Sequence, residues 1–219
     1  MKRLVVSDVH IGSKYYKAEA FTELLHTIEY DQLILNGDII DLIKAPVFTK
    51  RALKLFKSID SSKEIIYIIG NHDRAFSGFV GESLMGVKFV ERYEFTENQR
   101  TFRIEHGDSY DKDWIRYGFW IKFVSILQDA LEHYFNVDLT SWLLNRKIKK
   151  RKLKRIWELL DLNTDVDVLI TGHTHIPEAV IWVNENEQIK TYVNCGDWIS
   201  HSTYVIIDDG TVRLKTFKK

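Results

Sequence analysis

The residues best suited to chemistry in this chain occur in five short polar segments. These segments are Ser7-Asp8-Val9-His10, Gly37-Asp38-Ile39-Ile40-Asp41, Gly70-Asn71-His72-Asp73, His106-Gly107-Asp108 and Gly172-His173-Thr174-His175. They combine carboxylate, imidazole and amide groups without sulfur. Such nitrogen and oxygen ligands suit manganese, iron, zinc or nickel better than copper(I) or an iron–sulfur cluster. The five segments together therefore predict a divalent metal site.

The spacing within the segments supports this prediction. Residues i and i+2 of an extended stretch point to the same side, so Asp8 with His10, and His173 with His175, are expected to face one pocket. Glycine allows the sharp turns that would bring several strand ends together. Any single Gly-Asp or Gly-His step is ordinary turn chemistry. Six or seven ligands exceed the need of one ion with an open site, whereas two ions that share a carboxylate fit the count.

The segments follow short apolar runs that are typical of buried strands. These runs are Leu4-Val5-Val6, Leu33-Ile34-Leu35, Ile65-Ile66-Tyr67-Ile68-Ile69 and Val168-Leu169-Ile170. Residues 17–29 and 46–58 carry apolar side chains at helical spacing. The alternation of strand and helix predicts an α/β layered domain. Further strands are expected between Lys88 and Ile104 and after Thr191, with a hairpin turn at Asp208-Asp209-Gly210.

Residues 111–162 break this pattern. They contain no proline, and aromatic and aliphatic residues recur at helical intervals, which predicts two or three helices inserted as a cap. The length of 219 residues fits one domain, residues 1–219, with this insert. Lys plus Arg and Asp plus Glu are both 31, so overall charge favours neither nucleic acid nor membrane. The single cysteine and the absence of a signal-like run favour the cytoplasm.

The ordered segments resemble the calcineurin-like metallophosphoesterases over nearly the whole chain. That family's pattern is Asp-x-His, Gly-Asp-x-x-Asp, Gly-Asn-His-Asp/Glu, His and Gly-His-x-His, and every element is present. The resemblance implies a four-layer αββα sandwich of two mixed β-sheets flanked by helices. It implies two divalent ions, with manganese favoured and iron, zinc, nickel or magnesium as alternatives. By the resemblance, one ion is held by Asp8, His10, Asp38 and His175, and the other by Asp38, Asn71, His106 and His173.

The expected reaction is hydrolysis of a phosphoester or pyrophosphate bond. Two ions roughly 4 Å apart would share a water, lower its pKa and clamp the phosphoryl oxygens, and the resulting bridging hydroxide would attack phosphorus. His72, which the ligand count does not need, is predicted to stabilise charge or donate a proton to the leaving oxygen. Asp41 is expected to accept a hydrogen bond from His72 and keep it cationic. Asp73 and Asp108 are interpreted as supporting residues.

The insert and the ending from Tyr192 to His201 are similar to the UDP-2,3-diacylglucosamine hydrolase branch, which cleaves a lipid-linked nucleotide sugar in lipid A synthesis. The characterised enzyme of that branch has arginine in place of His72 and glutamate in place of Asp41. The segment 146–155 holds eight basic residues beside aromatic ones. It could contact anionic headgroups of the inner membrane surface, guide a diphosphate substrate, or simply form a solvated helix face.

Three other functions remain open. A nuclease or nucleotide phosphodiesterase could use the basic segment for phosphates and tryptophans for bases, so nucleic acid is not excluded as a partner. A non-catalytic interaction module is disfavoured, because the ligand set and His72 are intact. A protein phosphatase is not excluded by the shared motifs.

Overall fold

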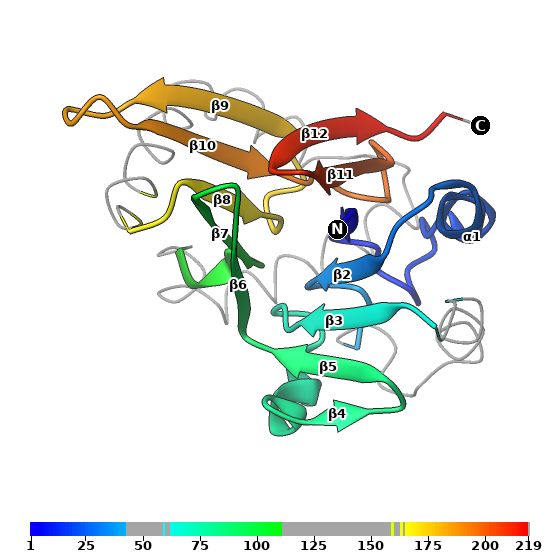
Figure 1. Ribbon diagram of the computed structural model, residues 1–219. Coiled ribbons are helices and arrows are strands. Elements are labelled where there is room, and N and C mark those ends of the chain that lie inside the picture. Colours follow the sequence, from blue (N-terminus) through cyan, green and yellow to red (C-terminus); the bar gives the residue numbers. More distant parts are fainter. Residues whose placement is uncertain (43–58, 60–61, 111–158, 160–162, 164, 219) are drawn as a thin grey trace. The chain divides into compact units, whose positions relative to one another are not determined.

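The computed structural model describes residues 1–42, 59, 62–110, 159, 163 and 165–218 (Figure 1). The chain divides into two compact units, Met1–Gly107 with Asp165–Lys219, and Asp108–Thr164. The first unit contains both β-sheets. The helix expected at 46–58 and the insert at 111–162 lie outside the described residues, so both stay predictions, as does the division into one domain with an insert.

The larger sheet has seven strands in the order β12-β11-β1-β2-β3-β5-β4. Its members are β1 (Arg3–Val6), β2 (Gln32–Asn36), β3 (Glu64–Ile68), β4 (Ser83–Leu84), β5 (Val87–Val90), β11 (Thr203–Asp208) and β12 (Thr211–Thr216). The four strands β1, β2, β3 and β5 run parallel, and antiparallel strands close both edges. The sheet is therefore mixed, and the carboxyl ends of its parallel strands share one edge.

The smaller sheet has five strands in the order β6-β7-β8-β10-β9. Its members are β6 (Arg92–Glu97), β7 (Arg100–Glu105), β8 (Val168–Thr171), β9 (Glu178–Val183) and β10 (Ile189–Asn194). Strands β7, β8 and β10 run parallel, with β6 and β9 antiparallel at the edges. This second mixed sheet again places several parallel carboxyl ends together.

Side chains of the central strands point alternately to the two faces of the sheet and pack into two separate hydrophobic cores. Val5 and Ile34 join an inter-sheet cluster with residues of the smaller sheet such as Phe102. Leu4 and Leu33 instead join a cluster on the opposite face of the larger sheet. Because both faces are covered, these strands are continuously apolar rather than alternating. The two mixed sheets pack face to face, which confirms the predicted sandwich.

Helix α1 (Ala18–Thr27) covers the outer face of the larger sheet. Its buried residues Phe21, Leu24 and Leu25 recur three and four positions apart, as the 17–29 pattern predicted. Short 3₁₀ helices occupy Arg74–Phe79 and Asp108–Tyr110. Among the described residues no helix is long and apolar enough to cross a membrane.

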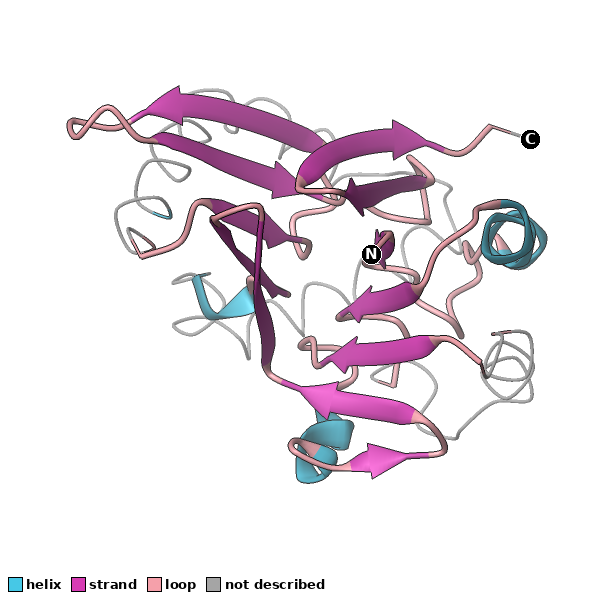
Figure 2. Cartoon of the chain, in the orientation of Figure 1, coloured by secondary structure: helices cyan, strands magenta, loops and turns pink. Residues whose placement is uncertain are grey.

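Most predicted strands are confirmed, and strands dominate the described part of the chain (Figure 2). Strands β4 and β9 were not predicted. β4 has only two residues, too short to produce a pattern. β9 is an edge strand whose alternate residues are exposed, and its apolar residues Ile181 and Val183 are among the exposed ones. Polar alternation, the usual mark of a half-buried strand, is therefore missing from β9.

Asp167, the residue before β8, connects β8 to the neighbouring strands β7 and β10 of the smaller sheet. Its carboxylate accepts the backbone N–H of Thr101 at 2.9 Å and the Lys190 ammonium at 3.0 Å. Burial raises the pKa of Asp167, but these two donors outweigh it and leave the pKa below its usual value. The charged form of Asp167 therefore stabilises the folded state.

Candidate metal centre

The predicted ligands all lie just beyond the carboxyl ends of five strands. Strands β1, β2 and β3 lead into the loops of Asp8 with His10, of Asp38, and of Asn71. β7 leads into His106, and β8 leads into His173 and His175. Since β1, β2 and β3 are parallel neighbours in one sheet, and β7 and β8 in the other, these loops gather at matching edges.

The backbones of the ligand loops are bonded directly to one another. Beyond β1 and β2, the backbone N–H of Asp8 donates to the backbone carbonyl of Gly37 at 3.1 Å. The backbone N–H of His10 donates to the backbone carbonyl of Asp38 at 2.9 Å. In the smaller sheet, Gly172 donates its N–H to His106 at 3.0 Å. These bonds continue the strand pairing into the loops, so that the ligand side chains start from a fixed backbone.

The structure brings the ligand atoms of six of the seven predicted metal ligands into groups no more than 4.8 Å across. One group is Asp8, His10 and His175, a second is Asp38, His106 and His173, and a third is His10, Asp38 and His72. Asn71, the seventh, lies next to the second group, with Oδ1 3.2 Å from His106 Nε2. The first group holds three of the four residues that the family resemblance assigned to one ion, without Asp38, and the second holds three of the four assigned to the other, without Asn71.

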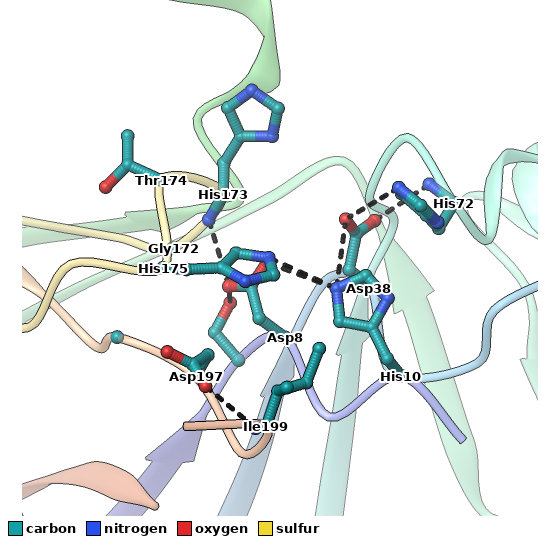
Figure 3. A network of polar contacts seen from close by, with 12 residues as sticks. Asp8, His10, Asp38, His72, Gly172, His173, Thr174, His175, Asp197 and Ile199 are labelled. Atoms are coloured by element: carbon teal, nitrogen blue, oxygen red, sulfur yellow. Dashed lines mark hydrogen bonds and ion pairs between the residues drawn. The ribbon is translucent and has the colours of Figure 1, made fainter. Parts of the chain in front are cut away.

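Asp38 lies between the groups. Its Oδ2 is 3.3 Å from His106 Nε2. The same oxygen is 3.9 Å from His10 Nε2 (Figure 3). Its other oxygen, Oδ1, accepts the backbone N–H of His72 at 2.8 Å. The carboxylate is thus anchored through one oxygen and presents the other to imidazoles of both groups. This is the position that a bridging ligand requires.

The backbone at the ligands differs from the extended geometry assumed from the sequence. Asp8, His10, Asp38, His173 and His175 all have φ between 51° and 65°, in the left-handed region. The extended i, i+2 argument was therefore wrong in conformation. Asp8 and His10 do share a ligand group, whereas His173 and His175 belong to different groups. Aspartate and histidine are among the few non-glycine residues that adopt this region with some frequency. Five such residues in one site indicate backbone strain that the surrounding contacts must maintain.

Glycines next to the ligands are required by close packing. A β-carbon on Gly70 would lie 2.3 Å from Asp38 Oδ1, and one on Gly37 would lie 2.3 Å from His106 Nδ1. A β-carbon on Gly172 would come within 2.5 Å of Asp8 Oδ2. The glycines of the motifs therefore make room for ligand side chains of neighbouring loops.

Several contacts fix the orientation of the ligands. His106 Nδ1 donates to the Asn36 carbonyl at 3.0 Å, which directs its Nε2 toward Asp38 and Asn71. Such a bond on the remote nitrogen is typical of metal-bound histidine. Asp8 Oδ2 accepts the N–H of His173 at 2.9 Å. The fully buried Asp8 Oδ1 accepts no hydrogen bond from the described residues, although His175 Nε2 lies 3.1 Å away.

The charges at the centre are coupled. Burial raises the pKa of Asp8 and Asp38, but His175 beside Asp8 and His106 beside Asp38 outweigh it and lower both values below the usual range. Burial lowers the pKa of His175, whereas Asp8 raises it, with a net increase. Buried carboxylates and imidazole nitrogens thus face one another, and positive charge among them stabilises the ionised carboxylates. The donor set fits divalent ions.

His72 and Asp41 form a pair at the edge of the centre. His72 Nδ1 lies 3.1 Å from Asp41 Oδ1, and His72 Nε2 lies 4.0 Å from Asp38 Oδ2. Burial lowers the pKa of His72, but the hydrogen bond to Asp41 and the charge of Asp38 raise it by more, so the pKa lies above its usual value. His72 is therefore held partly exposed beside the centre with its protonated form favoured.

Residues that provide no metal ligand connect the ligand loops to one another. No specific contact of these residues could be predicted from the sequence. Asp73 accepts the N–H of Ile39 at 3.0 Å, the Tyr67 hydroxyl at 2.6 Å and the N–H of Gly70 at 2.6 Å. Burial, followed by the Asp38 charge, raises the pKa of Asp73 to about 6. One carboxylate thus joins the loop of Asp38 to that of Asn71.

A second support lies behind the Gly172-His173-Thr174-His175 loop. The Asn194 side-chain amide donates to the Gly172 carbonyl at 2.7 Å, and its Oδ1 accepts the N–H of Gly196 at 2.9 Å. In the sequence, the only indication of a role for Asn194 is its place in the Tyr-Val-Asn-Cys-Gly-Asp-Trp stretch, one residue before Cys195. Cys195 itself is fully buried, and burial raises the pKa of its thiol, as expected for a packing residue.

Comparison with known families settles the relationship that this geometry suggests. A profile described as calcineurin-like phosphoesterase matches residues 1–177. The chain belongs to the calcineurin-like phosphoesterase family. No curated protein sequence matches the chain.

Solved structures of the same fold are distant in sequence. Vacuolar Protein Sorting 29 from Cryptosporidium parvum is 17% identical with a TM-score of 0.50, over 100% of this chain and 98% of that one. Vps29 from Chaetomium thermophilum is 13% identical with a TM-score of 0.50, over 100% and 97%. A phosphoesterase from E. coli, Yfce, is 15% identical with a TM-score of 0.47, over the full length of both chains. The first two support the fold alone.

Proposed function

We propose that this chain is a phosphoesterase that uses two divalent metal ions to hydrolyse a phosphoester or pyrophosphate bond. The observation that carries the proposal is the position of Asp38, whose Oδ2 faces His106 of one ligand group and His10 of the other. Asp8, His10, Asp38 and His175 would hold one ion, and Asp38, Asn71, His106 and His173 the other. When bound, the ions would supply Lewis acidity and lower the pKa of a coordinated water.

The chain's own residues would do the remaining work. The Asp38 carboxylate keeps its orientation because the His72 N–H holds Oδ1. Asp41 fixes the His72 ring through Nδ1, which directs Nε2 toward the centre. With its protonated form favoured, His72 would donate a proton from Nε2 to the leaving oxygen. A bound phosphoryl group would therefore be flanked by the ligand groups on one side and this acid on the other.

We further propose nucleotide sugar diphosphates, including lipid-linked ones, as the substrate class to test first. This finer proposal rests on the sequence similarity of the insert and of the ending from Tyr192 to His201. Contact with a membrane surface through the insert belongs to the same proposal. Manganese is the ion to supply first, because the ligand set accepts it.

A substrate panel with manganese present tests both levels. The panel contains bis(p-nitrophenyl) phosphate, a diacylated UDP-sugar, a simple UDP-sugar, linear and cyclic nucleotides, single-stranded DNA and a phosphopeptide. Metal-dependent hydrolysis of the aryl diester, lost in His72→Ala, supports the phosphoesterase. Preference for the acylated substrate supports the lipid proposal, whereas salt-sensitive cleavage of DNA favours a nuclease. Absence of all hydrolysis in protein with verified metals would instead point to a non-catalytic interaction module.

A further inference from the structure

A second carboxylate–histidine pair, Asp197 with His201, lies near the ligand loops. Asp197 is 1% exposed, and its Oδ2 pairs with His201 Nδ1 at 2.5 Å. The Asp197 Oδ1 accepts the backbone N–H of Ile199 at 2.7 Å and of Ser200 at 2.5 Å. A buried carboxylate persists only where such partners offset its desolvation. This one is used to build a tight turn and to hold one imidazole.

The turn is attached to the candidate metal centre. Trp198, the residue after Asp197, donates its backbone N–H to the Asp8 carbonyl at 3.0 Å. Its indole is fully buried against Phe21. Figure 3 shows Asp197 beside Asp8 and His175. Burial lowers the pKa of His175, and the charges of Asp8 and Asp197 raise it. The turn is thus anchored both to a ligand backbone and to the core.

A lysine reinforces the same turn. Lys17 Nζ donates to the Ser200 carbonyl at 3.2 Å and to Ser202 Oγ at 3.1 Å, on either side of His201 in the sequence. An ammonium group has three N–H donors, and among the described residues these contacts account for two. The His201 side chain is 47% exposed, so its imidazole is accessible although Asp197 fixes its orientation. Lys17 and His201 therefore place nitrogen donors on the same turn.

His201 lies near the ligand groups without belonging to one of them. The ligand groups found among the described residues do not include His201. Its partner Asp197 lies beside His175 in Figure 3. A donor on this turn is therefore suited to a group that is attached to the reacting phosphoryl group.

We propose that His201 and Lys17 form a second anion subsite, which binds a phosphoryl group adjacent to the scissile one. This inference rests on the proposed function and deepens it, because it selects substrates with two linked phosphoryl groups over simple phosphodiesters. The His201 Nε2 and the Lys17 ammonium supply the hydrogen bonds to the anionic oxygens. Asp197 acts through His201 and is a positioning residue.

The test uses the manganese-loaded protein and compares His201→Asn with His26→Asn. Asparagine at 201 can still donate from Nδ2 to Asp197, so the turn keeps its buried pair, but it lacks Nε2. His26 is an exposed histidine on α1, outside the ligand loops, and serves as the matched control. Binding of UDP and of UMP is measured by calorimetry, because the two differ only in the second phosphoryl group.

The wild-type protein and His26→Asn are expected to bind UDP about tenfold tighter than UMP, or more, and His201→Asn is expected to lose that preference. Equal binding of both nucleotides by the wild type, or a full preference in His201→Asn, would overturn the subsite. Hydrolysis of bis(p-nitrophenyl) phosphate is measured in parallel. If the UDP preference depends on His201 but no ester is cleaved, the subsite stands and the proposed hydrolysis fails. If the ester is cleaved without a UDP preference, only the subsite fails.

Discussion

Replacement of Gly70 by alanine should damage the metal centre from a position that provides no ligand. A β-carbon at residue 70 would lie 2.5 Å from the backbone nitrogen of Asp38 and 2.3 Å from its Oδ1. Ordinary contact begins at 3.4 Å, so the two loops must separate by about 0.9 Å. Overpacking of this kind costs about 1–3 kcal/mol, which lowers the melting temperature by roughly 2–12 °C for a chain of this size.

The same displacement should weaken function more than stability. A shift of about 1 Å in a positioned group can reduce turnover on the order of 100-fold. Thermal unfolding, calorimetric titration with manganese and hydrolysis of an aryl phosphodiester measure the three effects. Gly78→Ala is the control, because a β-carbon at Gly78 meets no atom within 4 Å and the residue does not require positive φ. Wild-type manganese affinity and turnover in Gly70→Ala would show that the close packing does not position Asp38.

Three further outcomes follow from named contacts. His72→Ala should reduce turnover by about 10²–10⁴-fold while the metal content, measured by mass spectrometry, is unchanged. Asp38→Ala should instead lose metal. Loss of metal from His72→Ala would mean that His72 is a ligand. Tyr67→Phe removes a buried donor to Asp73 and should cost about 1–3 kcal/mol in a denaturant titration, and no change would show that the hydroxyl is dispensable. The lowered pKa of Asp167 contributes stability that is fully present above the unfolded value of 3.8 and is lost as pH falls through the lower folded value. Asp167→Asn should therefore cost more stability at neutral pH than in strong acid, and equal losses in both conditions would contradict this linkage.

The sheets could be predicted from the sequence because strands that are buried on both faces consist of apolar residues. The run Leu4-Val5-Val6 is apolar at every position since one core takes Leu4 and Val6 and the other takes Val5. The convergence of the site followed from the same logic. When polar residues follow buried strands that turn out to be parallel, their side chains must meet at one edge.

The local geometry of the site could not be predicted in the same way. Nothing in the sequence around Asp8 specifies φ of 53°, because aspartate adopts the left-handed region only occasionally. That conformation depends on a hydrogen bond to Gly37, 29 residues away. The role of Asn194 likewise depends on a bond to Gly172 that joins two strands. Contacts between distant segments decide these details, and a single sequence gives no measure of them.

The centre combines strain with unfavourable charge, and both have a common explanation in preorganisation. Left-handed backbone at Asp8 and Asp38 costs free energy, and so does the burial of their carboxylates close together. The fold maintains this arrangement through bonds between the loops, the glycine contacts and the Asp73 carboxylate, none of which involves an ion. Ligand atoms are thus fixed before a cation arrives, and the attraction between cation and carboxylates is not spent on ordering the loops. Under the proposed function, a centre built in this way would bind ions and still hold the two ligand groups in one geometry, as in-line attack on phosphorus requires.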